Sequence, residues 1–114
     1  MSVYSIYFSP TNSTKEIANL VANEVGSYQE IDLSKKEDMV DQVFDADDVC
    51  VIGVPSYGGR VPGIALERMN KFKGNHAKAI LVVSYGNRAF EDTLKELADN
   101  LSKRGFYCFA AIAA

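Results

Sequence analysis

The chain has no tryptophan, only three prolines, two cysteines and a single histidine. Two cysteines are too few for a disulfide-stapled scaffold, and neither Cys50 nor Cys108 has a second cysteine or a histidine at metal-ligand spacing. Both lie in apolar segments typical of strands, so we interpret them as buried thiols. His76 stands alone, and we expect it in a surface loop. The sequence therefore predicts no metal site.

Basic clusters and long apolar runs are also absent. The formal net charge is −3, and no stripe of Lys or Arg is available to neutralise a phosphate backbone, which argues against nucleic acid as a partner. No apolar run reaches the roughly 18 residues of a membrane helix, and no secretory leader opens the chain. We therefore expect a cytoplasmic protein that binds neither nucleic acid nor membranes.

What the sequence does contain fits one domain. With 114 residues, of which 47% are hydrophobic and 24% charged, the chain can bury a single core, so we expect one domain over residues 1–114. The last residues, Ala110 to Ala114, are still strand-like. We expect either a domain truncated at this end or a bare sheet face covered by a second copy of the chain.

Apolar runs alternate with helical patterns along the whole chain. In the helical segments apolar residues recur at three- and four-residue spacing, as Leu94, Leu97 and Leu101 do. The predicted strands are Val3–Phe8, Tyr28–Leu33, Asp48–Val54, Ala77–Ser84 and Phe106–Ile112. The predicted helices are Ser13–Val25, a weak one at Glu37–Phe44, Pro62–Phe72 and Phe90–Lys103.

This order of elements predicts an α/β fold with a doubly wound, five-stranded parallel sheet. The segments Val49–Val54 and Ala79–Val83 are continuously apolar, as strands are when helices cover both faces of a sheet. Tyr28–Leu33 is more polar and is expected at an edge. Right-handed crossovers favour the strand order 2-1-3-4-5, with the final helix missing. In that order ligands bind beyond the carboxyl ends of the first and third strands.

A hydroxyl-rich run, Ser9 to Thr14, lies at that position, between the first strand and the first helix. Its hydroxyl groups and the unpaired N–H groups of a helix N-terminus favour an anion. Because the run contains no Lys or Arg, it suits a monophosphate better than a nucleoside triphosphate. The alternative is a capping box, with Ser13 as the N-cap residue and Glu16 as its partner.

Two further loops leave the carboxyl ends of the third and fourth strands. Pro55–Pro62 and Ser84–Phe90 each contain a tyrosine, a following glycine and a nearby arginine. A flat, partly apolar ring would use an aromatic side chain for stacking and backbone groups that glycine brings close. Either loop by itself could be only a turn, but three loops meet at one edge of the predicted sheet.

Together the three loops resemble those of flavodoxins. The closest likeness is to the flavodoxin domain of iron–sulfur flavoprotein-like fusions, in which it precedes a bacterial-type ferredoxin domain, and the likeness covers nearly all of the chain. The segment Tyr85–Asp92 is the strongest local match. The sequence departs from the pattern at Asn12, where many flavodoxins have glycine, and it contains no Cys-x-x-Cys-x-x-Cys cluster of a ferredoxin half.

The resemblance implies a noncovalently bound flavin mononucleotide (FMN), with no catalytic residue and no metal ligand. Residues of the first loop would hold the phosphate, and residues of the other two loops would surround the ring. For the phosphate these are Ser9, Thr11, Asn12, Ser13 and Thr14. For the ring they are Pro55, Ser56, Tyr57, Gly58, Gly59, Arg60, Ser84, Tyr85, Gly86, Asn87 and Arg88.

The function that the resemblance implies is electron transfer between a reductase and an acceptor, with a ferredoxin-type iron–sulfur domain as a partner. The alternative is an NAD(P)H-dependent FMN or quinone reductase, although the sequence has no Gly-x-Gly-x-x-Gly motif for a nicotinamide cofactor. A phosphate-accepting receiver domain is strongly disfavoured, because Phe8-Ser9 and Val54-Pro55 stand where its acidic residues would be. A thiol-dependent phosphatase is excluded because the first loop has neither Cys nor Arg.

Overall fold

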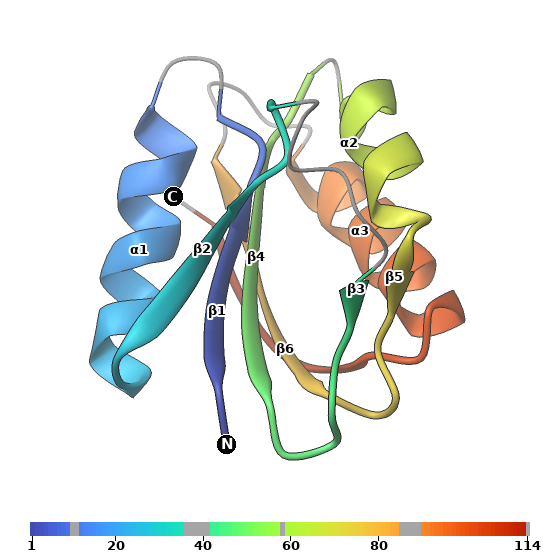
Figure 1. The fold of residues 1–114 in the computed structure, drawn as a ribbon. Coiled ribbons are helices and arrows are strands. Elements are labelled where there is room, and N and C mark those ends of the chain that lie inside the picture. The colour runs from blue at the N-terminus through green and yellow to red at the C-terminus, as the bar shows by residue number, and fades with distance from the viewer. Residues whose placement is uncertain (10–11, 36–41, 58, 85–89, 114) are drawn as a thin grey trace.

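Five parallel strands form the central sheet of the computed structural model (Figure 1). The structure describes residues 1–9, 12–35, 42–57, 59–84 and 90–113. The strands of this sheet are β1 (Val3–Tyr7), β2 (Tyr28–Asp32), β4 (Val49–Pro55), β6 (Lys78–Ser84) and β7 (Tyr107–Ala113). Their order, β2-β1-β4-β6-β7, confirms the predicted order 2-1-3-4-5, because β4, β6 and β7 are the third, fourth and fifth strands of this sheet along the chain.

Helices cover both faces of the sheet. α1 (Ser13–Val25) lies alone on one face, whereas α2 (Gly63–Met69) and α3 (Phe90–Lys103) lie on the other (Figure 1). α1 and α3 have the predicted bounds. These three are the helices of the described residues, and none of them follows β7, which agrees with the predicted doubly wound fold without its final helix.

The weak helix predicted at Glu37–Phe44 is wrong where the structure describes it. Gln42–Val43 form a short strand, β3, which pairs in parallel with β5 (Phe72–Lys73). Positions 37–41 lie outside the described residues. The helix predicted at Pro62–Phe72 is also too long, because α2 ends at Met69 and β5 follows it.

An aromatic cluster explains why these residues leave the helical pattern. The side chain of Phe44 is buried, and its ring packs edge-on against Tyr4 and Phe72, with ring centroids 5.1 and 5.5 Å apart. The ring of Phe106 lies 5.5 Å from that of Phe44. The extended backbone of β3 and β5 brings Phe44 and Phe72 into one core. Tertiary packing here overrides a weak local preference.

Alternate residues of the central strands face the two helical layers. Ile6 and Ile52 belong to the larger core cluster, which lies on the side of α2 and α3. Val51 faces α1 and packs in a smaller cluster with Ala18 and Ala22. Burial on both faces is the physical reason for the continuously apolar strands of the sequence.

The edge strand β7 is exposed over most of its length. α1 packs on β1, β4 and β6, and three large apolar side chains of β7 remain open to solvent, Tyr107 (61% exposed), Phe109 (48%) and Ile112 (37%). Coverage of this strand by a second copy of the chain stays a prediction. Among the described residues, the helices are too short or too polar to span a membrane.

Phe44→Ala is expected to lower the free energy of unfolding by about 3–5 kcal/mol, because it removes the central ring of the aromatic cluster and leaves a cavity. Val43→Ala is the matched control, since the Val43 side chain is 65% exposed and its removal should change stability by less than about 0.5 kcal/mol. Urea unfolding followed by circular dichroism measures both. Equal losses in the two variants would contradict the role given to Phe44.

Candidate functional site

Described residues from the three predicted loops lie together where β1, β4 and β6 end. These strands are parallel neighbours, so their carboxyl ends lie at the same edge of the sheet, at the top of Figure 1. Two contacts tie the loops together. The hydroxyl groups of Thr14 and Ser84 share a hydrogen bond of 2.7 Å, and the backbone N–H of Ser56 donates to the carbonyl of Ser84 at 2.9 Å. The structure thus brings predicted site residues from all three loops together.

The first turn of α1 differs from the capping box that the sequence offered as the alternative. Asn12, and not Ser13, is the N-cap residue, and its side chain makes no capping hydrogen bond. Ser9, which precedes Asn12 in the chain, provides the side-chain capping bond instead. Its Oγ accepts the backbone N–H of Lys15 at 2.9 Å. The carbonyl of Asn12 accepts the N–H of Glu16 at 3.0 Å. Ser9 and Asn12 therefore both accept backbone N–H groups from the first turn of the helix.

Asn12 has a left-handed backbone, with a φ of 69°. Glycine adopts this conformation at little cost, and asparagine is among the few other residues that tolerate it. The position at which the sequence departs from the flavodoxin pattern can therefore still make the turn that the loop requires.

The hydroxyl groups of the first loop keep protons that an anion can accept. A hydroxyl that accepts the Lys15 N–H, as that of Ser9 does, still has its own proton to donate. In the pair of Thr14 and Ser84, the accepting hydroxyl likewise keeps its proton. Ser9 and Thr14 are buried, which limits their motion. Neutral donors held at a helix N-terminus suit a phosphate group.

Gly53 is a site residue that the sequence analysis missed. A Cβ atom at this position would lie 3.0 Å from Cγ2 of Thr14 and 3.3 Å from Cβ of Ala18. A residue without a side chain lets the first turn of α1 come this close to β4. The available signal was a glycine inside an otherwise apolar strand.

The second loop folds back on itself as a tight turn. Tyr57 and Arg60 exchange two backbone hydrogen bonds, of 2.9 and 3.0 Å. Gly59 lies inside the turn with a φ of 80°, which glycine adopts more readily than other residues. The turn leaves the Tyr57 side chain 52% exposed. A flat ring can therefore stack on it.

Two residues of α3, Thr93 and Glu96, hold the second loop, and sequence reasoning missed both. The buried hydroxyl of Thr93 lies 2.6 Å from that of Ser56. Glu96 accepts the backbone N–H of Val61 at 2.7 Å and pairs with the guanidinium of Arg60 at 2.6 Å. Their three-residue spacing puts both on one face of α3. No local pattern links that face to a loop so much earlier in the chain.

The ion pair between Arg60 and Glu96 affects the ionisation of both groups. The hydrogen bond from Arg60 holds the pKa of Glu96 below its usual value, against the opposing effect of partial burial. The same contact raises the pKa of Arg60. Because the Arg60 side chain is 72% exposed, water screens much of the attraction. The cation predicted beside the ligand ring is therefore already paired with an acid.

Six of the predicted site residues lie outside the described residues, and their roles stay predictions. They are Thr11, Gly58, Tyr85, Gly86, Asn87 and Arg88. The other predicted residues lie at the same edge of the sheet. Pro55, for example, ends β4 and stands opposite Ser84 in the register between β4 and β6.

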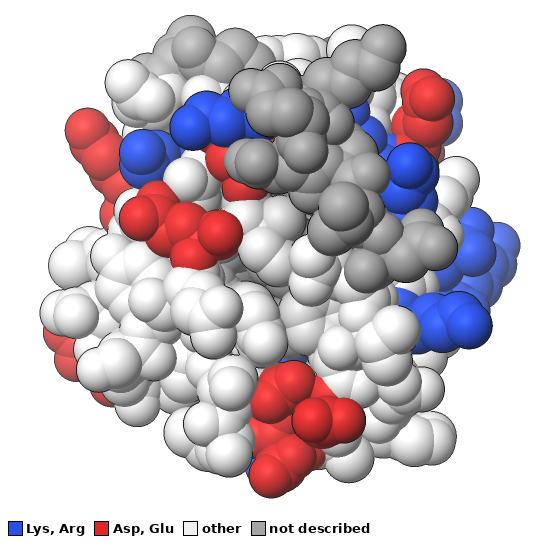
Figure 2. All heavy atoms as spheres, in the orientation of Figure 1, with Lys and Arg blue, Asp and Glu red and all other residues white. Residues whose placement is uncertain are grey.

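A cluster of acidic side chains lies at the end of the molecule opposite the carboxyl ends of β1, β4 and β6. Figure 2 shows an acidic group at its lower end, where Figure 1 shows the turn between β3 and β4. There, carboxylate oxygens of Asp45, Asp47 and Asp48 lie within 4.8 Å of one another. The backbone N–H groups of Ser2 and Asp45 donate to Asp48, and the N-terminal ammonium pairs with Asp47 at 3.7 Å. Because protein donors already contact the carboxylates of Asp47 and Asp48, we assign no metal site to this cluster.

Comparisons with known proteins show similarity in structure alone. No protein-family model and no curated protein matches the chain. A candidate flavoprotein from Bacteroides uniformis is 20% identical with a TM-score of 0.72, over 98% of this chain and 88% of that one. A flavoprotein in complex with FMN from Lactobacillus acidophilus is 13% identical with a TM-score of 0.67, over 98% of this chain and 92% of that one.

A third similar structure is a flavodiiron core from Synechocystis. It is 18% identical with a TM-score of 0.70, and the match spans all of this chain but 30% of that protein. At such identities the likeness shows the fold and nothing finer. The chain has a flavodoxin-like fold.

Glu96→Gln is expected to lower the melting temperature at neutral pH, because it weakens the contacts to Arg60 and Val61. The pKa of Glu96 is lowered in the folded protein, so its contribution is complete above the ordinary glutamate value of 4.5 and is lost as the pH falls through the lowered value. The difference in melting temperature between wild type and variant should therefore shrink in acid.

The control for this measurement is Glu67→Gln, on the exposed face of α2. Scanning calorimetry at a series of pH values gives the melting temperatures. A difference between wild type and Glu96→Gln that does not change with pH would mean that the carboxylate charge does not hold the loop.

Proposed function

We propose that this protein binds FMN noncovalently and carries electrons between a reductase and an acceptor protein. The observation that supports this best is the arrangement of hydroxyl groups at the N-terminus of α1, which we call the cradle. It consists of Ser9, Thr14 and Ser84. The cradle lies at the carboxyl ends of β1, β4 and β6, where a doubly wound sheet binds its ligand.

The cradle fits the phosphate of FMN in charge and in donor chemistry. The end of α1 supplies a partial positive charge, and the hydroxyl groups supply neutral donors. Residues of the first loop, including Asn12 and Ser13, would hold the phosphate together with Ser9 and Thr14. A triphosphate would bring more charge than neutral donors can balance, and it normally requires a lysine and a metal ion.

The second loop fits the ring of FMN. The exposed side chain of Tyr57 offers a stacking surface, and Gly59, which has no side chain, would let the backbone come close to a ring. The loop from Ser84 to Arg88 would flank the ring from the end of β6. Bound FMN supplies the redox chemistry, whereas the chain binds it, orients it and sets the charges around it.

The structural comparison supports the same ligand class. The flavoprotein from Lactobacillus acidophilus was solved in complex with FMN and shares this fold. One fold serves many functions, so the fold by itself would be a weak argument. The proposal therefore depends on the cradle.

The chemistry of the loops favours a carrier over an enzyme. In the described parts of the three loops no carboxylate or imidazole is available as a general acid or base for a substrate. The alternative, an NAD(P)H-dependent FMN or quinone reductase, is tested by mixing the FMN-loaded protein with NADPH alone. Fast bleaching of the flavin absorbance without a partner protein would favour the reductase.

Thr14→Ala is expected to weaken FMN binding roughly 10- to 100-fold, because it removes a charge-assisted hydrogen bond worth about 1.5–3 kcal/mol. Ser27→Ala is the matched control, since Ser27 is exposed beyond the other end of α1. Quenching of flavin fluorescence measures both affinities. Riboflavin, which lacks the phosphate, should bind wild-type protein far more weakly. Tight riboflavin binding would contradict the cradle.

Arg60→Ala is expected to lower the midpoint potential of bound FMN, and Glu96→Gln is expected to raise it. Reduction adds negative charge to the flavin, which a nearby cation favours, and Glu96 offsets that cation through its ion pair with Arg60. Spectroelectrochemistry measures both potentials. Because the expected signs are opposite, each variant is the control for the other, and shifts in the same direction would rule out this electrostatic role.

A further inference from the structure

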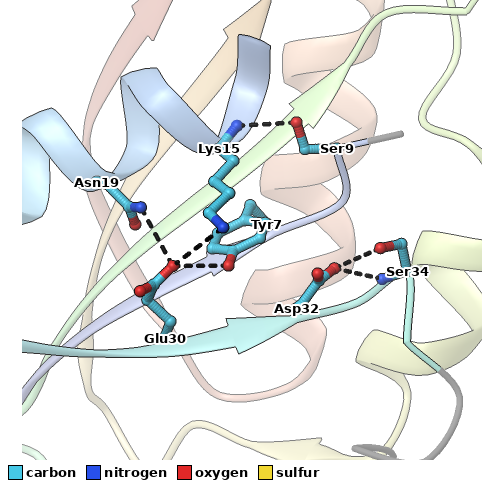
Figure 3. A network of polar contacts seen from close by, with 7 residues as sticks. All are labelled: Tyr7, Ser9, Lys15, Asn19, Glu30, Asp32 and Ser34. Carbon is cyan, nitrogen blue, oxygen red and sulfur yellow. Dashed lines mark hydrogen bonds and ion pairs between the residues drawn. The ribbon is translucent and has the colours of Figure 1, made fainter. Parts of the chain in front are cut away.

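A polar network lies beside the cradle, at the carboxyl ends of β1 and β2 (Figure 3). Its centre is Oε1 of Glu30. This atom accepts the hydroxyl of Tyr7 at 2.7 Å and the side-chain amide of Asn19 at 3.2 Å. The ammonium group of Lys15 lies 3.9 Å from the same oxygen and 5.7 Å from the centre of the Tyr7 ring. One carboxylate oxygen of β2 thus contacts three side chains, one from β1 and two from α1.

Lys15 connects this network to the cradle. It is the third residue of α1, and its backbone N–H donates to Oγ of Ser9. Side chains of a helix start out toward its N-terminus, so the ammonium group of a lysine in the first turn can reach an anion bound there. In this structure, however, the Lys15 side chain points to Glu30, as Figure 3 shows.

Glu30 stays ionised, but its ion pair with Lys15 is partly exposed and can break at low cost. Hydrogen bonds from Tyr7 and Asn19 hold the pKa of Glu30 below its usual value, so the carboxylate remains ionised at neutral pH. The side chains of Lys15 and Glu30 are 42% and 43% exposed. An exposed ion pair of this kind contributes little to stability, and its lysine can turn to another anion at low cost.

We propose that Glu30 is a positioning residue that holds the ammonium group of Lys15 off the cradle, so that Glu30 and a bound phosphate compete for it. This inference rests on the proposed function, because the phosphate is that of FMN. Glu30 keeps the cradle close to neutral in the free protein. The phosphate recruits Lys15 on binding, and the affinity for FMN is set below what an unpaired lysine would give.

A double-mutant cycle tests this competition. Glu30→Gln removes the charge but keeps a carbonyl oxygen to accept the bonds from Tyr7 and Asn19. It is expected to tighten FMN binding about threefold to tenfold, the range of a surface ion pair that becomes a phosphate contact. Lys15→Met is expected to weaken FMN binding by a similar factor. In the Lys15→Met background, Glu30→Gln should change the affinity less than twofold.

The controls separate charge from structure. Asn19→Ala removes another donor to Glu30 without changing any charge, and it should alter FMN affinity less than twofold. Thermal unfolding shows whether each variant is folded as the wild type is. Riboflavin binding should not respond to Glu30→Gln, because riboflavin has no phosphate. Inorganic phosphate, titrated as a competitor of FMN, should bind the Glu30→Gln variant more tightly than the wild type.

The outcomes distinguish this inference from the proposed function. If wild-type protein binds FMN but Glu30→Gln has the same effect with and without Lys15, Glu30 acts on the phosphate directly and the inference is overturned alone. A Glu30→Gln variant with unchanged or weaker FMN affinity also overturns the inference and leaves the proposed function intact. If wild-type protein binds neither FMN nor inorganic phosphate, the proposed function and the inference both fail.

Discussion

The close approach of the first turn of α1 to β4 is the contact on which the candidate site depends. It occurs at Gly53, where a side chain would run into Thr14. Because the helix end lies directly on the sheet, Thr14 reaches Ser84 at the end of β6, and α1 is joined to β6 across β4. The N-terminal partial charge of α1 is thereby aimed at the edge of the sheet where the parallel strands end.

Two ion pairs lie near the candidate site. Arg60 is matched with Glu96 in the second loop, and Lys15 is matched with Glu30 beside the first. The donors of the cradle itself are neutral hydroxyl groups. Both of these cations are already engaged, so the affinity of the proposed FMN site would depend on how readily they leave their partners.

The cores on the two sides of the sheet differ in size and composition. The side of α2 and α3 holds the larger core, and the aromatic cluster around Phe44 belongs to it. The side of α1 has a smaller core, built largely from small and β-branched residues such as Ala18 and Val51. Small side chains let α1 lie close to the sheet, which the cradle requires. The packing of α1 on this side of the sheet therefore also sets the position of the proposed binding site.

The sequence by itself determined the order of the elements, the strand order of the sheet and the edge at which the loops meet. Those features follow from local patterns, namely apolar strands, helical periodicity and a hydroxyl-rich run at a strand end. Contacts between distant segments were decided only by the tertiary structure. They turned Gln42–Val43 into a strand, made Ser9 rather than Ser13 the acceptor for the helix end, and placed Glu96 under the second loop. No local pattern encodes these contacts, because each partner is chosen by the three-dimensional packing of residues far apart in the chain.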